Sequence, residues 1–213
     1  MSLLFTNEWF TCKNAISKKD CNRITKLAQN NWGDAKVALG TVNKQLEEGK
    51  WETDDKKRIC DVFFTSEQWV YDLLWPFMWE ANERAGWKLD ISSVEAMQIT
   101  RYKKGGFYTW HIDGTADSLS GYNTPTNPFM HGKVRKISMS LILNDDYEGG
   151  EFELGRVWSK VGGHKNEECE IAPIKLKRGD MVFFHSGLEH RVLPVTKGVR
   201  HSLVVWFLGP PVR

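Results

Sequence analysis

The chain has 213 residues, of which 41% are hydrophobic and 26% are charged, a balance that excludes a disordered or collagen-like protein. This length suits one domain with a sizeable core, so we expect a single catalytic domain over residues 1–213. The net charge is only +2, which gives no reason to expect binding to nucleic acid or to an anionic membrane.

The cysteines and the N-terminal segment indicate a cellular compartment. The four cysteines form no C-x-x-C pair, and no apolar run approaches the roughly 20 residues that a membrane helix needs. The N-terminal segment MSLLFTNEWF has no basic region ahead of an apolar one. We therefore expect a cytoplasmic protein with reduced thiols. No feature of the sequence indicates an oligomeric state.

The first part of the chain has helical periodicity. Ser17 opens a capping box at the start of one helix. A second helix is predicted from Ser66, where apolar residues recur at helical spacing; Pro76 should kink or divide it, and Gly86 can end it. We expect residues 1–90 to form a mainly helical region that supports the rest of the domain.

From about residue 91 the apolar period changes to two. The segment KISMSL (136–141) alternates polar and apolar residues, which predicts a half-buried strand. Further short strands follow, separated by glycine-containing turns, and the last of them, 201–208, is apolar on both faces and should be central. The sequence thus predicts an α+β, mainly β protein whose residues 91–208 form a sandwich or barrel.

Two histidines and a carboxylate stand out in this second part. On a strand, His111 and Asp113 would point to the same face. A surface histidine beside an Asp-Gly turn would give the same sequence pattern. With His190 they could occupy one face of an octahedron and leave three positions for a bidentate 2-oxo acid and dioxygen, as in non-haem Fe(II) oxygenases. Arg200 could then pair with the far carboxylate of a dicarboxylic 2-oxo acid, with Ser202 on the same face.

Three segments carry a family resemblance: QITRYKKGGFYTWHID (98–113), RKISMSLILNDDYEGGEFEL (135–154) and KRGDMVFFHSGLEHRVLPVTKGVRHSLVVWF (177–207). They resemble the 2-oxoglutarate/Fe(II)-dependent dioxygenases, specifically the prolyl-4-hydroxylase-like branch with the bacterial PKHD-type hydroxylases. The resemblance covers roughly 95–208. It implies a double-stranded β-helix (a jelly roll, cupin-like) flanked by N-terminal helices.

The resemblance also implies a set of site residues and cofactors. The implied iron ligands are His111, Asp113 and His190, with no further catalytic side chain. The implied contacts of 2-oxoglutarate are Arg200, Tyr102 and Ser202. Animal prolyl 4-hydroxylases usually carry lysine where Arg200 stands, which favours the bacterial branch. The cofactors implied are Fe(II), 2-oxoglutarate and O2, with ascorbate as a candidate reductant.

The implied activity is hydroxylation of an unactivated C–H bond with release of succinate and CO2, after ordered binding of 2-oxoglutarate and then substrate. A prolyl residue in a peptide or protein is the first candidate substrate. The same chemistry on a free amino acid, a small metabolite or a damaged nucleobase is the alternative. A non-catalytic, metal-binding jelly-roll module is the alternative of another class, and Arg200 argues against it because a structural metal needs no such cation.

Other residues leave alternatives open at this stage. His185 could replace His190 as the distal ligand, and Asp117 could replace Asp113. Trp110 and Trp206 could line a substrate cleft or simply pack in the core. The basic run 133–136 is typical of a solvated strand face.

The segment 114–133, rich in Gly, Ser, Thr, Asn and Pro, is predicted to be a loop. It follows the first two candidate ligands directly, so we expect a mobile lid that closes over the metal when substrate binds. Tyr122 or Phe129 would then touch the substrate.

Overall fold

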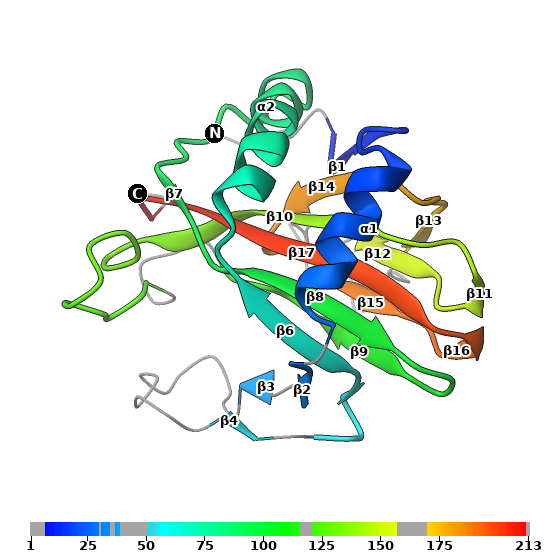
Figure 1. Ribbon diagram of the computed structural model, residues 1–213. Coiled ribbons are helices and arrows are strands. Elements are labelled where there is room, and N and C mark those ends of the chain that lie inside the picture. Colours follow the sequence, from blue (N-terminus) through cyan, green and yellow to red (C-terminus); the bar gives the residue numbers. More distant parts are fainter. Residues whose placement is uncertain are drawn as a thin grey trace.

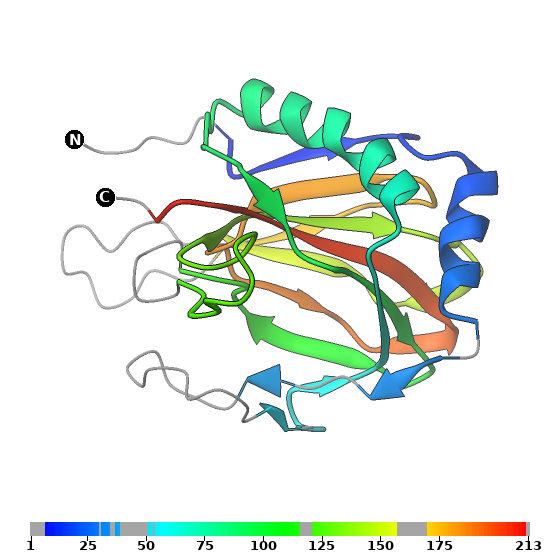
Figure 2. The same ribbon diagram turned by 60° about the vertical axis from the view of Figure 1, so that its left-hand side comes forward.

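Two antiparallel β-sheets face each other, and two helices cover the outer face of the larger sheet (Figures 1 and 2). This computed structural model describes residues 7–29, 31–34, 37–38, 51–52, 54–115, 121–156 and 170–211. The larger sheet has the strand order β1-β14-β10-β17-β8-β6-β2, with β7 beside β17. The smaller sheet has the order β13-β12-β15-β9-β5.

The strands of the larger sheet are β1 (Trp9–Cys12), β2 (Gly33–Asp34), β6 (Asp61–Thr65), β7 (Ser93–Val94), β8 (Met97–Tyr102), β10 (Val134–Ile142), β14 (Met181–His185) and β17 (Arg200–Gly209). Those of the smaller sheet are β5 (Arg58–Ile59), β9 (Phe107–His111), β12 (Phe152–Arg156), β13 (Glu170–Ile174) and β15 (His190–Val192). Two short pairs join β3 (Val37–Ala38) to β4 (Trp51–Glu52) and β11 (Tyr147–Gly149) to β16 (Val195–Gly198). From β8 onward the chain passes back and forth between the two sheets, which confirms the α+β jelly roll.

Helix α1 (Lys18–Leu27) begins as the sequence predicts. The side chain of Ser17 accepts a hydrogen bond from the backbone N–H of Asp20, so one of the free donors of the first turn is satisfied. Cys21 and Ile24 are fully buried on the helix face that packs on the larger sheet. The capping box and the apolar face thus fix both the start and the orientation of this helix.

Helix α2 (Gln68–Arg84) runs through Pro76 undivided, so of the two effects predicted for this proline, a kink or a division, the division is wrong. Interior proline costs a helix about 3 kcal/mol, but Val70, Leu74 and Met78 are buried against the larger sheet on both sides of it. This packing outweighs the local cost. The predicted end is confirmed: Gly86 has a φ of 74°, and the N–H of Trp87 donates to the carbonyl of Asn82 (3.1 Å).

The first 90 residues hold more than helices. Strand β1 pairs with β14, and β6 pairs with β8, so both lie in the larger sheet. The expectation of a mainly helical region is wrong for these segments. Both strands are short, and β6 directly precedes the helical pattern of α2, so their periodicity is easily hidden in the sequence.

Strand β10 was predicted to be half-buried, but the structure buries both of its faces. It lies between β14 and β17, where the helices cover one face of the sheet and the smaller sheet covers the other. Met139 therefore packs with the helices, while Ser138 points inward and shares a hydrogen bond with Ser186 (3.0 Å). Strand β17 is central, as the sequence predicts.

The buried side chains form two separate apolar clusters. The outer core lies between the helices and the larger sheet, and the inner core lies between the two sheets. The inner core is small and consists of Tyr102, Phe152, Leu154, Val182, Phe184, Val192 and Val195. The space between the sheets therefore also has room for polar groups. Among the described residues, no helix combines the length and apolarity that a membrane crossing requires.

Candidate metal centre

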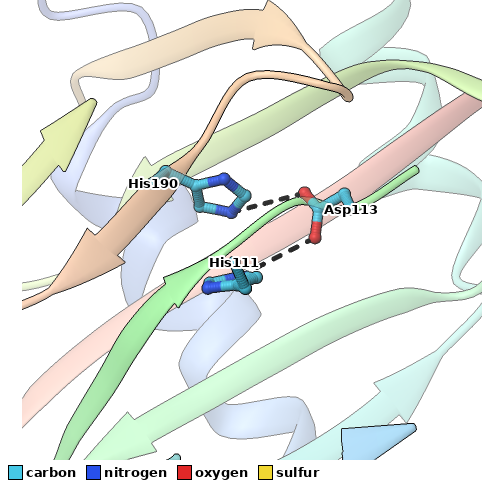
Figure 3. A group of neighbouring side chains, drawn as sticks. All are labelled: His111, Asp113 and His190. Carbon is cyan, nitrogen blue, oxygen red and sulfur yellow. Dashed lines mark ion pairs between the residues drawn. The ribbon is translucent and has the colours of Figure 1, made fainter. Parts of the chain in front are cut away.

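Three side chains converge at one end of the space between the sheets (Figure 3). His111 ends β9, Asp113 follows it by two residues, and His190 begins β15 opposite His111. The Nε2 atom of His190 lies 3.5 Å from Asp113 Oδ2, and that of His111 lies 3.9 Å from Asp113 Oδ1. One ligand atom from each residue lies within 4.8 Å of the other two, so a single cation can contact all three.

A β-bulge directs His111 toward this point. His111 faces His190 across the strand pair while Tyr108 faces Val192, so β9 has one residue more than β15 between these pairs. The rings of Tyr108 and His111 stack at 3.5 Å on the same face despite their spacing of three. The sequence predicts a regular strand through Asp113, but Asp113 lies beyond its end and is held by a hydrogen bond from its N–H to the carbonyl of Ser186 (2.9 Å).

Backbone carbonyls fix the tautomer of both histidines. His111 Nδ1 lies 2.8 Å from the carbonyl oxygen of Thr109, and His190 Nδ1 lies 3.0 Å from that of Leu188. A carbonyl can only accept, so each Nδ1 carries the proton and donates it. The lone pair of each Nε2 is then directed toward Asp113, which is the arrangement that a histidine needs to bind a metal.

The charges of the group also suit a cation. Burial, together with the neighbouring His190, lowers the pKa of His111 to about 3, so its imidazole is neutral at pH 7. Burial opposes the charge of Asp113, but His190 and His111 outweigh it and lower the pKa of its carboxyl to about 2. Asp113 Oδ2 is buried and accepts no hydrogen bond. Two imidazole nitrogens around such an unsatisfied carboxylate oxygen are a fitting donor set for Fe(II).

Arg200 lies deeper between the sheets, at the start of β17, and is only 1% exposed. Its Nη1 donates to Ser202 Oγ (3.0 Å), while Nε and Nη2 are buried without a partner. Tyr102 stands opposite it on β8, with its ring centroid 5.5 Å from Arg200 Cζ. Burial raises the pKa of Tyr102, so its hydroxyl stays protonated and can donate. These groups form a cradle of donors that suits a carboxylate.

Gly150 is a site residue that sequence reasoning missed. A Cβ on Gly150 would lie 2.9 Å from Arg200 Cδ, and the backbone here has a φ of +66°. Glycine therefore leaves the space that the arginine side chain occupies. The paired glycines 149–150 look like an ordinary turn in the sequence, and only the long-range contact shows their role.

The fold and the donor set agree with known proteins. The family model of the 2OG-Fe(II) oxygenase superfamily matches residues 97–208, more than half of the chain. The chain belongs to this superfamily. By family it is a 2-oxoglutarate-dependent dioxygenase.

Curated relatives of this oxygenase are PKHD-type hydroxylases. One from Synechococcus sp. (strain CC9311) is 29% identical over 197 residues, which cover 90% of this chain and 74% of the relative. One from Xylella fastidiosa (strain M12) is 33% identical over 111 residues, which cover 51% of this chain and 42% of the relative. Seven PKHD-type hydroxylases, including the Xylella protein, are aligned over only 41–49% of their length.

Solved structures share the fold. A prolyl hydroxylase from Trichoplax adhaerens, in complex with a hypoxia inducible factor peptide fragment, has a TM-score of 0.65 at 16% identity and covers 95% of this chain and 84% of its own. A viral collagen prolyl hydroxylase from Paramecium Bursaria Chlorella virus-1, in a 2OG complex, has a TM-score of 0.62 at 17% identity. The match covers 98% of this chain and 99% of the viral chain.

A polar network beside the metal centre of this oxygenase was also missed. Arg135 donates from Nε and Nη2 to the two carboxylate oxygens of Glu95 (2.6 and 2.7 Å) and from Nη1 to the carbonyl oxygen of Asp113 (3.2 Å). Tyr122 donates to Glu95 Oε1 (2.8 Å), and Trp206 lies under the guanidinium, its ring centroid 4.0 Å from Cζ. The basic run around Arg135 suggested a solvated strand face. Its position beside buried Glu95 overturns that interpretation for this residue.

The predicted cleft residues therefore fall into two groups. Tyr122 and Trp206 belong to the network beside the triad. Phe129 is 69% exposed, and its carbonyl accepts a hydrogen bond from Ser93. Trp110 packs against the guanidinium of Arg191. Arg191 points away from the metal centre because the preceding residue of β15, His190, points toward it.

The alternative ligands are placed as follows. His185 ends β14, and its Nδ1 accepts a hydrogen bond from the N–H of Gly187 (3.2 Å). It is not part of the His111–Asp113–His190 group, the one cluster of at least three histidine, cysteine or acidic ligands found among the described residues. Asp117 and residues 116–120 of the predicted lid lie outside the described residues.

Proposed function

We propose that this oxygenase hydroxylates a prolyl residue in a peptide or protein and converts 2-oxoglutarate to succinate and CO2. The observation that carries the proposal is the buried, unpaired Arg200 next to a group of metal ligands. A buried guanidinium without a partner is costly, so this position calls for an anion. The curated names PKHD-type hydroxylase and the prolyl hydroxylase structures support the choice of substrate.

The residues divide the work of binding. We assign His111, Asp113 and His190 to Fe(II), which supplies the activation of dioxygen when bound. We assign Arg200 to the far carboxylate of 2-oxoglutarate, where Nε and Nη2 can donate to it. Ser202 holds the third side of the guanidinium in place, and Tyr102 can donate its hydroxyl to the same carboxylate.

The network around Arg135 suits the other substrate. Its guanidinium ties the backbone of Asp113 to Glu95 and covers Trp206, whose indole N–H is buried without a partner. A peptide carbonyl could accept that N–H. In this arrangement Tyr122 connects the segment 121–133 to the same network, so this part of the predicted lid lies beside the metal centre.

The test is turnover with a defined panel. The protein is incubated with Fe(II), 2-oxoglutarate and ascorbate, with each of a set of proline-containing peptides and free amino acids. We expect succinate to form and one proline peptide to gain a single oxygen atom, detected by mass spectrometry. Oxygen gained only by a free amino acid or another small molecule would replace the prolyl assignment. Metal binding without any succinate would favour the non-catalytic alternative.

A further inference from the structure

A second arginine, Arg58, lies close to the metal centre. It belongs to β5 and pairs with Tyr108 of β9, so both side chains point to the inner face of the smaller sheet. Arg58 is only 8% exposed, and its Cζ lies 4.6 Å from the centroid of the Tyr108 ring. The same ring stacks on that of His111 at 3.5 Å. A single aromatic ring thus connects this guanidinium to one of the residues that we assign to Fe(II).

Nothing near Arg58 in the described part of the chain balances its charge. Its side chain makes one hydrogen bond there, from Nε to Cys60 Sγ (2.9 Å), and it belongs to no ion pair. Burial raises the pKa of the Cys60 thiol and of the Tyr102 and Tyr108 hydroxyls, so all three neighbours are neutral at pH 7. Arg58 is therefore a nearly buried cation without a counter-ion, which is costly unless a ligand supplies the anion.

The free nitrogens of Arg58 differ from those of Arg200. Nε and Nη2 of Arg200 are sealed from solvent. Nη1 and Nη2 of Arg58 have no partner among the described residues either, but they are not sealed. The positive charges of both arginines act on the hydroxyl of Tyr102, so the two guanidiniums lie near the same point of the site. Arg58 can therefore receive a ligand group that is distinct from the carboxylate assigned to Arg200.

The other charges of the site cancel once the assigned cofactors are bound. The two positive charges of Fe(II) and the one of Arg200 are matched by Asp113 and by the dianion 2-oxoglutarate. Arg135 is matched by Glu95, which accepts from it with both carboxylate oxygens. Among these groups, the charge of Arg58 alone is left over. The prolyl substrate is the one remaining component that can supply a negative charge.

We propose that Arg58 is a carboxylate subsite for the substrate, so that the prolyl residue to be hydroxylated is accompanied by a carboxylate. This inference rests on the proposed function and narrows its substrate class. The two Nη groups form a planar fork that matches the two oxygens of a carboxylate. The carboxylate belongs to an Asp or Glu side chain beside the proline, or to a peptide that ends at the proline. Both sources present the same group to Arg58.

Matched peptides test the subsite and distinguish the two sources. The reference is acetyl-Ala-Ala-Pro-Ala-Ala-amide. In one series Asp, or Asn as its neutral counterpart, replaces each alanine in turn. In a second series the peptide ends at the proline, either as the free acid or as the amide. Kd is measured by isothermal titration on full-length protein loaded with Mn(II) and 2-oxoglutarate, without turnover, and oxygen addition to the same peptides is measured with Fe(II).

Wild-type protein should bind at least one acid about tenfold more tightly than its amide counterpart, as expected for a charge-assisted pair of hydrogen bonds. Arg58→Met should remove this difference and leave the Kd of the reference peptide unchanged. Arg58→Lys, which keeps the charge but not the fork, should retain part of it. If Arg58→Met does not fold, Arg58→Gln serves as the neutral variant. Equal Kd values for every acid and its amide in wild type would overturn the proposal without any variant.

Arg191→Met is the matched control. Arg191 also packs on an aromatic ring, with Cζ 4.6 Å from the centroid of Trp110, but it is paired with Glu153 (2.7 Å) and points away from the metal centre. This variant should keep the full preference for the acid. A preference that persists in Arg58→Met, or that is lost equally in both variants, would remove Arg58 as its cause.

Failure of the proposed function gives a different result. If no proline peptide gains oxygen, the prolyl assignment itself fails. If acids and amides gain oxygen equally and bind equally, the prolyl assignment stands and only the carboxylate subsite is wrong.

Discussion

The two faces of β17 differ in what they contribute to this protein. Leu203, Val205 and Phe207 point to the outer core and pack with the helices. Arg200, Ser202 and Trp206 point inward, where two of these three side chains have unpaired polar groups. Alternate residues of one strand therefore either pack in the outer core or present polar groups to the space between the sheets. Substitutions on the two faces should be separable by experiment.

The largest loss should follow from the inward-facing ligands. His190→Ala removes one of three donors, so we expect the loss of Fe(II) binding and of succinate formation, with the fold retained. Metal content after dialysis and succinate production measure the two effects. His185→Ala is the control, because that residue lies outside the ligand group. An inactive His185→Ala beside an active His190→Ala would reverse the ligand assignment.

An outward substitution should instead affect folding. Phe207 is 1% exposed and packs edge-on against Trp75, with ring centroids 5.3 Å apart. Phe207→Ala should lower the free energy of unfolding by about 3–5 kcal/mol, measured by urea denaturation. The Kd of 2-oxoglutarate for the folded fraction should not change. The neighbouring Trp206→Phe should cost much less stability, and a similar cost for both would weaken the distinction between the faces.

Arg200→Met tests the affinity for 2-oxoglutarate and the stability of the fold at once. Losing one partner of a charge pair in a dry site costs about 2–5 kcal/mol, so the affinity for 2-oxoglutarate should fall steeply while metal binding persists. Without ligand, the variant should be more stable than wild type, since a buried and partly unpaired charge is removed. Isothermal titration and urea denaturation check the two effects. A variant that is destabilised and binds 2-oxoglutarate normally would remove Arg200 from the site.

Arg135→Met should have an intermediate effect that acts through Asp113. The guanidinium holds the Asp113 carbonyl and does not touch the three ligand atoms. Loss of such outer support typically reduces metal affinity about 10–100-fold. Competition with a metal chelator measures this affinity. Arg135→Lys, which cannot reproduce the bidentate contact with Glu95, should recover only part of it.

The smallest effects are expected from single hydroxyl groups. Tyr102→Phe removes one neutral donor facing Arg200, which should weaken 2-oxoglutarate binding by about 0.5–1.5 kcal/mol. Tyr122→Phe removes a similar bond to Glu95 but should leave 2-oxoglutarate binding unchanged. Each variant loses only a tyrosine hydroxyl oxygen. Titration of both with 2-oxoglutarate therefore shows whether the affinity depends on the Arg200 side of the metal centre alone or also on the Glu95 side. If both variants bound 2-oxoglutarate equally weakly, the two sides of the metal centre would be coupled.

The parts of the protein that sequence reasoning found are those with local signals. The capping box at Ser17, the glycine at the end of α2 and the order His-x-Asp, His, Arg are all visible within short segments. The features it missed depend on contacts between distant segments. Pro76 stays helical because of packing, and Arg135 is buried because Glu95, forty residues earlier, meets it.

The bulge in β9 decides to which side of the sheet the imidazole of His111 points. Between Tyr108 and His111 the strand has one residue more than its partner, and this extra residue turns the imidazole inward. If β9 were regular over these residues, the odd spacing from Tyr108 would instead point His111 to the other side of the sheet. A homologue with the same spacing but no bulge at this point could thus match the family by its motif and still direct this histidine away from Asp113 and His190.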